Sequence, residues 1–88
     1  MSDADGSALA GLGLAPGEEV RFRRADRARW QLGAVRRVER DGSLRITDAD
    51  GAARTVPLAN VEVRIRGRRG WEPAADRAAR SIQLTLSL

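Results

Sequence analysis

The sequence predicts a small all-β fold, a five-stranded barrel in a single domain. Three observations support this prediction: short runs in which apolar and polar residues alternate, tight-turn signals between these runs, and a length of 88 residues. A chain of this length buries only about 60% of the surface that its unfolded form exposes, so its core is thin. We therefore expect one sheet that closes on itself, without a second domain.

The first two expected strands are separated by a polar loop. Val20 and Phe22 alternate with arginines in the first strand, directly after a proline-glycine turn signal. The second strand covers residues 30–38, with Gly33 at a bend and a change of phase after Ala34. Such a change of phase fits a β-bulge or a strongly bent strand, which a small barrel needs in order to close.

Turn signals bound the remaining strands. Asp41-Gly42 predicts a hairpin whose two central residues both have positive φ, and residues 48–51 predict a second tight turn. A third strand lies between these turns, a fourth ends at a single helical turn over 57–60, and a fifth covers 61–65. This pattern describes an SH3-like barrel at residues 17–70. Its inward-facing residues are expected to be Val20, Phe22, Leu32, Val35, Val38, Leu44, Ile46, Val56, Leu58, Val61, Val63 and Ile65.

The segments on either side are expected to lie outside the barrel. Residues 1–16 are small, polar and interrupted by glycine, which predicts a flexible leader rather than a helix. Residues 71–88 form a C-terminal tail. Within it, residues 74–80 can form a short helix that carries an Asp76–Arg80 pair at i, i+4.

The basic charge is concentrated in the predicted barrel. The chain has 16 basic residues, all of them arginine, against 12 acidic residues. An arginine-rich domain suggests an anionic partner, nucleic acid first, because guanidinium groups match phosphate geometry. The alternative is a solvated surface in an arginine-rich proteome. The candidate nucleic-acid-binding residues are Arg21, Arg23, Arg36, Arg37, Arg45, Arg64, Arg66, Arg68, Arg69, Trp30 and Trp71, of which the two tryptophans either stack on bases or pack against the barrel.

The composition argues against an enzyme. Cysteine, histidine and lysine are absent, so the commonest general base and the commonest metal ligands are missing. Asp48 and Asp50 share a turn and are interpreted as turn formers rather than cation ligands. We expect no catalytic residue, no cofactor and no metal. No apolar run approaches the roughly 20 residues of a membrane span.

Residues 18–66 resemble the Tudor-like branch of SH3-like barrels, and the resemblance is carried by residues 29–35, 44–51 and 55–61. Tudor domains that read methylated side chains use a cage of aromatic rings. Here Trp30 stands at a cage position, Ala49 replaces the aromatic residue of the second turn, and tyrosine is absent. The resemblance therefore implies contact with nucleic acid or protein, as in bacterial DNA-repair proteins that carry such a barrel.

The last six residues are similar to a bacterial sliding-clamp-binding motif. The hexapeptide form of that motif is glutamine, leucine, any residue, leucine, any residue, then leucine or phenylalanine. The similarity implies that a glutamine amide binds a polar subsite and that leucines enter an apolar groove on the clamp. Residues 82–88 also alternate as an amphipathic strand would, so they are either a free motif or a strand added to the barrel. The implied clamp-binding residues are Gln83, Leu84, Leu86 and Leu88.

Together, the barrel and the hexapeptide resemble the C-terminal region of actinobacterial Y-family (translesion) DNA polymerases. This resemblance implies a non-catalytic tethering module in DNA repair or replication. Its partners would be the DNA sliding clamp and either DNA or another repair protein. Two alternatives stay open: a purely protein-binding or structural barrel, and an RNA-binding barrel. We expect a cytoplasmic, nucleoid-associated monomer.

Overall fold

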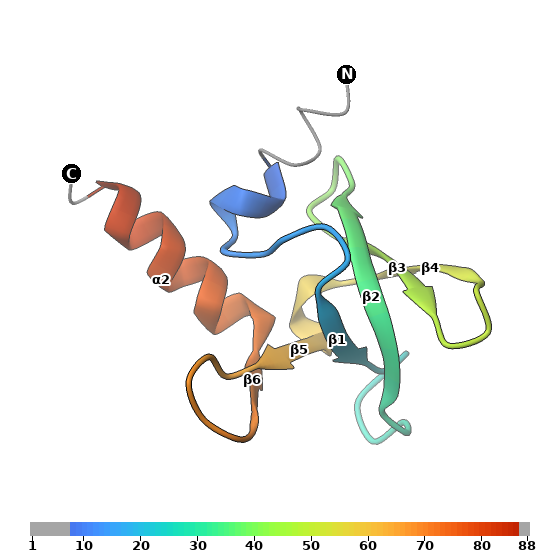
Figure 1. Ribbon diagram of the computed structural model, residues 1–88. Coiled ribbons are helices and arrows are strands. Elements are labelled where there is room, and N and C mark those ends of the chain that lie inside the picture. Colours follow the sequence, from blue (N-terminus) through green and yellow to red (C-terminus); the bar gives the residue numbers. More distant parts are fainter. Residues whose placement is uncertain (1–7, 87–88) are drawn as a thin grey trace.

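Six antiparallel strands and a C-terminal helix make up the fold (Figure 1). The computed structural model describes residues 8–86. The elements are β1 (Glu19–Phe22), β2 (Gln31–Val38), β3 (Leu44–Asp48), β4 (Ala53–Val56), the 3-10 turn η1 (Leu58–Asn60), β5 (Val61–Arg64), β6 (Trp71–Pro73) and α2 (Ala74–Leu86). The strands form one sheet in the order β4-β3-β2-β1-β5-β6.

The predicted all-β character is confirmed for the sheet, which has one strand more than expected. The additional strand, β6, pairs with β5 and places Trp71 opposite Arg64. The helical turn expected before the fifth strand is present as η1. The helix expected in the tail begins at Ala74, as the sequence predicts, but it extends to Leu86.

The alternative of a strand at the C-terminus is wrong for residues 82–86, because these residues belong to α2. Ala74, Arg77 and Ala78 are buried, and their i, i+3, i+4 spacing marks the helix face that packs toward β5 and β6. Once this face is anchored, each further helical residue adds one backbone hydrogen bond. This gain favours the helix over the strand that the short alternating pattern of residues 82–88 suggests. Within residues 8–86, no helix is long and apolar enough to cross a membrane.

The two predicted turns are present, but the geometry of the first differs from the prediction. The N–H of Gly42 donates to the carbonyl oxygen of Glu39 (3.0 Å), which closes a four-residue turn. In this turn Gly42 has φ 88°, whereas within residues 8–86 the only non-glycine residue with positive φ is Arg27. The prediction of positive φ at Asp41 is therefore wrong. Its carboxylate instead accepts the N–H of Ser43 (3.0 Å), which stabilises the turn locally.

The predicted irregularity in the second strand is present as a β-bulge in β2. The register between β2 and β3 shifts between Val35 and Arg37, just beyond the change of phase in the sequence. Gly33 serves a different purpose from the expected bend. A Cβ atom at Gly33 would lie 2.7 Å from both Ile46 Cγ2 and Thr47 O. The glycine therefore allows β3 to approach β2 closely.

Eight of the twelve predicted core residues are buried: Val20, Phe22, Val35, Leu44, Ile46, Val56, Val61 and Val63. Val38, Leu58 and Ile65 are partly buried. The prediction for Leu32 is wrong, because this side chain is 51% exposed. Leu32 pairs with Arg21, while Gly33 pairs with the buried Val20. Directly paired residues share a face of the sheet, so Gly33 faces the core and Leu32 faces outward.

The prediction of a flexible leader is wrong for residues 8–14. Residues 8–11 form a helical turn. Gly13, which has φ 75°, terminates it. The N–H of Gly13 donates to Ala10 O and that of Leu14 donates to Leu9 O, each at 2.9 Å. This is the Schellman pattern of helix ends, in which the residues at the Leu9 and Leu14 positions make an apolar contact. Both leucines are buried in the main core. The core therefore includes residues that precede residue 17, the expected start of the barrel.

Candidate nucleic-acid interface

Two tryptophans and three arginines stack alternately on the outer face of the sheet. The Cζ atom of Arg23 lies 4.4 Å and that of Arg21 lies 4.5 Å from the ring centroid of Trp30. Arg21 also lies 5.1 Å from the ring centroid of Trp71, and Arg64 lies 4.3 Å from the same ring. These five residues form what we call the arginine–tryptophan array. The distances fall within the range of cation–π interactions.

The strand pairing explains why the array forms. Val20 and Phe22 face the core, so Arg21 between them faces outward. Arg64 is paired with Trp71 across β5 and β6, which places the second ring beside the neighbouring strand. Arg21 therefore lies between two rings that are 41 positions apart in the chain.

Each arginine of the array has one acidic partner among the described residues. Arg21 Nε donates to Glu62 Oε1 (2.8 Å), and Arg64 Nε donates to Glu19 Oε1 (3.1 Å). A carboxylate oxygen of Asp26 lies 3.9 Å from Arg23 Nη2. The hydrogen bonds of Arg21 and Arg64 orient their guanidinium planes against the rings, and all three pairs offset the charge of the array.

The positive charge beside the array comes from the loop that joins β1 to β2. This loop carries Arg24, Arg27 and Arg29, all exposed, and ends at Trp30. For these three arginines, residues 8–86 contain no ion-pair partner. These arginines were not among the predicted residues, although their clustering around a tryptophan was a usable signal. Arg24 lines a pocket with Phe22 and Gln31 against β4, so we call only the array together with Arg27 and Arg29 the arginine–tryptophan face.

The structure places the other predicted arginines elsewhere. Arg37 Nε and Arg45 Nε both donate to Glu39 Oε1, at 3.2 and 3.0 Å, on β2 and β3. Both hydrogen bonds hold the pKa of Glu39 below its ordinary value, and the bond from Arg37 has the largest effect. Arg36 Nε donates to Thr47 Oγ1 (3.0 Å).

The loop between β5 and β6 holds the last three predicted arginines, Arg66, Arg68 and Arg69, all of them exposed. Because β1 and β5 are antiparallel, this loop lies at the other end of the sheet from the β1–β2 loop. The structure therefore brings five of the eleven predicted nucleic-acid residues into one array and separates the rest.

The residues implied in clamp binding lie at the end of α2. Gln83 and Leu84 are exposed, Leu84 by 69%, and Leu86 is the last residue of the helix. Leu88 lies outside the described residues. The side chain of Leu86 also lies outside the part of the chain that the structure describes.

Asp48 confirms its interpretation as a turn former. Its Oδ1 atom accepts the N–H groups of Asp50 (3.0 Å) and Ala52 (2.9 Å), and its Oδ2 atom accepts Arg54 Nε (3.0 Å). These hydrogen bonds hold the pKa of Asp48 below its ordinary value. The bond from Ala52 has the largest effect, followed by the bond from Arg54. Within residues 8–86, no group of three acidic, histidine or cysteine side chains is arranged to hold a metal ion.

Comparison of the chain with protein-family models, with curated protein sequences and with solved structures finds no match.

Proposed function

We propose that this chain is a non-catalytic module that binds single-stranded nucleic acid on the arginine–tryptophan face. The observation that carries the proposal is the placement of Trp30 and Trp71 in an ordered array beside two exposed arginines, Arg27 and Arg29, without acidic partners among the described residues. Rings and guanidinium planes both offer surfaces on which bases can stack. The arginines of the β1–β2 loop would contact the phosphates of the same strand.

The proposed fold of this module is an SH3-like, Tudor-like barrel. Two observations support it: the order β4-β3-β2-β1-β5 within the sheet, and the 3-10 turn η1 between β4 and β5. The bulge in β2 adds the local bend that closure of such a barrel needs. On this view, β6 and α2 are additions that follow the last barrel strand.

Titration with a single-stranded oligonucleotide is expected to quench the tryptophan fluorescence of the protein. The chain has two tryptophans and no tyrosine, so its emission comes from the array alone. The logarithm of the binding constant should fall with the logarithm of salt concentration by about 0.7 for each phosphate contact. In the variant R27Q/R29Q this slope should become shallower by about 1.4, because two contacts are lost.

Arg40 provides the matched control. It is exposed, residues 8–86 contain no ion-pair partner for it, and it follows β2, whereas the β1–β2 loop precedes that strand. The variant R40Q should keep the salt slope of the unmodified protein. Unquenched emission, or an equal loss of slope in R40Q, would contradict the proposal. Parallel titrations with DNA and RNA of one sequence decide between the DNA-binding and RNA-binding alternatives.

Docking on the sliding clamp is a second proposed function, and the exposure of Gln83 and Leu84 at the end of α2 supports it. Calorimetry with the clamp of the same organism should show micromolar binding that disappears when residues 83–88 are removed. The variant L84A should lose most of this binding. In contrast, I82A should retain it, because Ile82 is also exposed and apolar but precedes the hexapeptide. No heat with the unmodified protein would exclude clamp docking.

A further inference from the structure

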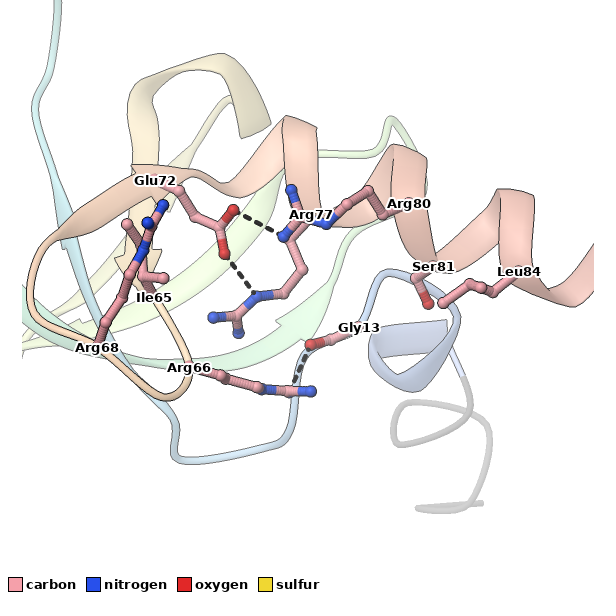
Figure 2. Close-up of a pocket in the computed structure, with 9 residues that line it drawn as sticks. All are labelled: Gly13, Ile65, Arg66, Arg68, Glu72, Arg77, Arg80, Ser81 and Leu84. Atoms are coloured by element: carbon pink, nitrogen blue, oxygen red, sulfur yellow. Dashed lines mark hydrogen bonds and ion pairs between the residues drawn. The ribbon is translucent and has the colours of Figure 1, made fainter.

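A pocket of about 350 Å³ lies between α2 and the loop that joins β5 to β6, apart from the arginine–tryptophan array (Figure 2). Four arginines line it: Arg66 and Arg68 from the loop, and Arg77 and Arg80 from the helix. Among the described residues, Glu72 is the only acidic one in the lining. The pocket is therefore strongly basic although it holds few residues.

The helix arginines of the pocket are already paired. Arg80 Nη2 donates to Glu72 Oε1 (2.7 Å), and Arg77 Nε lies 3.5 Å from Glu72 Oε2. The hydrogen bond from Arg80 is the main reason that the pKa of Glu72 lies below its ordinary value, so this carboxylate remains ionised at neutral pH. Arg77 also donates to the carboxylate of Glu18 and to the carbonyl oxygen of Arg64.

The loop arginines of the pocket are not neutralised. Arg66 Nη2 donates to the carbonyl oxygen of Gly13 (3.0 Å), which carries no formal charge. For Arg68, residues 8–86 contain no hydrogen-bond or ion-pair partner. The negative charges of Glu18 and Glu72 offset the positive charges of Arg77 and Arg80. The two positive charges that remain belong to Arg66 and Arg68.

The walls of the pocket are held in place by the fold. Arg77 is 5% exposed, so its position is fixed by packing as well as by its ion pairs. Gly13 forms part of the opposite wall, where a Cβ atom would lie 3.1 Å from Arg77 Cγ and 3.3 Å from Ser81 Cβ. The same turn presents the carbonyl group that orients Arg66. The helix wall and Arg66 are thus in place before any ligand arrives, which lowers the entropic cost of binding.

We propose that this pocket binds a phosphate monoester, with Arg66 and Arg68 as the groups that contact the phosphate. A dianionic phosphate matches the two uncompensated charges, and guanidinium forks suit its oxygen atoms. The volume lies at the lower end of the range for small-molecule sites, about 300–1,000 Å³, and exceeds that of inorganic phosphate. The remaining space, beside Ile65 and Leu84, accommodates an organic group such as a nucleoside.

The phosphate monoester has two possible sources, a free nucleotide or the terminal phosphate of a strand. The second source rests on the proposed function, because Trp71 of the array directly precedes Glu72 of the pocket. The first source does not depend on it.

The test follows the arginine Nε–H signals of the full chain by NMR during titration with adenosine monophosphate, with adenosine, and with a short single strand that carries or lacks a 5′-phosphate. The monophosphate is expected to shift the signals of Arg66 and Arg68, and adenosine is not. In the variant R68Q the affinity should fall at least about tenfold, as for the loss of a charged hydrogen bond. The control R69Q should stay within about twofold, because Arg69 is the exposed neighbour that does not line the pocket.

Tighter binding of the 5′-phosphorylated strand than of the mononucleotide identifies a strand terminus as the ligand, and the reverse order identifies a free nucleotide. Absence of shifts at Arg66 and Arg68 with every phosphate compound, or equal losses in R68Q and R69Q, overturns the proposal. Tryptophan quenching reports only on the array. A failure of the array proposal is therefore distinguishable from a failure of this pocket.

Discussion

Replacing Leu9 with alanine is expected to lower the free energy of unfolding by about 3 kcal/mol, as for other buried leucines. Leu9 is completely buried in the main core, together with Leu14. Removing its side chain leaves a cavity that the small core cannot refill. The total stability of a domain of this size is on the order of 5–13 kcal/mol, so the loss is a large fraction of it. Urea unfolding followed by circular dichroism measures the effect.

The variant L32A is the matched control for Leu9. It removes the same atoms from a leucine that is 51% exposed, on the outer face of β2. The expected loss is below about 0.5 kcal/mol, in the range of ordinary surface substitutions. Equal losses in L9A and L32A would show that the segment before β1 does not belong to the core.

Replacing Arg77 with alanine is expected to cost about 3 kcal/mol, which is the usual effect of removing one partner from a buried ion pair. The guanidinium group of Arg77 joins Glu18, before β1, to Glu72, in β6, and it also reaches the main chain at Arg64. Without it, the carboxylate of Glu18 loses its ion-pair partner within the described residues while it is only 20% exposed. Urea unfolding measures this loss as well.

Arg80 separates this effect from a general loss of charge. It binds the same Glu72, but its side chain is 57% exposed. The variant R80A is expected to lose less than about 1 kcal/mol, and this loss should shrink further in 1 M salt. The loss in R77A should change little with salt. Similar losses in both variants would contradict a structural role for Arg77.

The strands could be predicted from the sequence because their alternation is unbroken. Leu44 and Ile46 alternate with polar residues between two turns, and both are buried as expected. Leu32 could not be placed in this way. A run that contains a glycine and a bulge has two possible phases, and only the pairing of Gly33 with Val20 decides between them.

The composition of the N-terminal segment predicts flexibility, whereas the spacing of its residues predicts the helical turn. Leu9, Gly13 and Leu14 occupy the positions at which a Schellman motif needs an apolar residue, a glycine and a second apolar residue. That spacing was present in the sequence as a usable signal. Residue frequencies conceal it, because glycine and alanine in this segment indicate flexibility on average.

All five members of the array were among the predicted residues, but their stacking was not predictable. It depends on β6, which brings Trp71 opposite Arg64, and a three-residue strand that ends in proline has almost no pattern of its own. The acidic partners Glu62 and Glu19 are also set by strand register, which is a tertiary property. Sequence patterns identify the types of residue, and pairing decides which of them meet.

Both edges of the sheet are unsuited to recruiting a further strand. β6 has only three residues and ends at Pro73, which has no N–H group to donate to a neighbouring chain. The chain then turns directly into α2. At the other edge, β4 carries an exposed arginine, Arg54, whose guanidinium is held by Asp48. Charges and prolines on edge strands disfavour edge-to-edge pairing, so we expect this sheet to resist the growth that leads to β-aggregates.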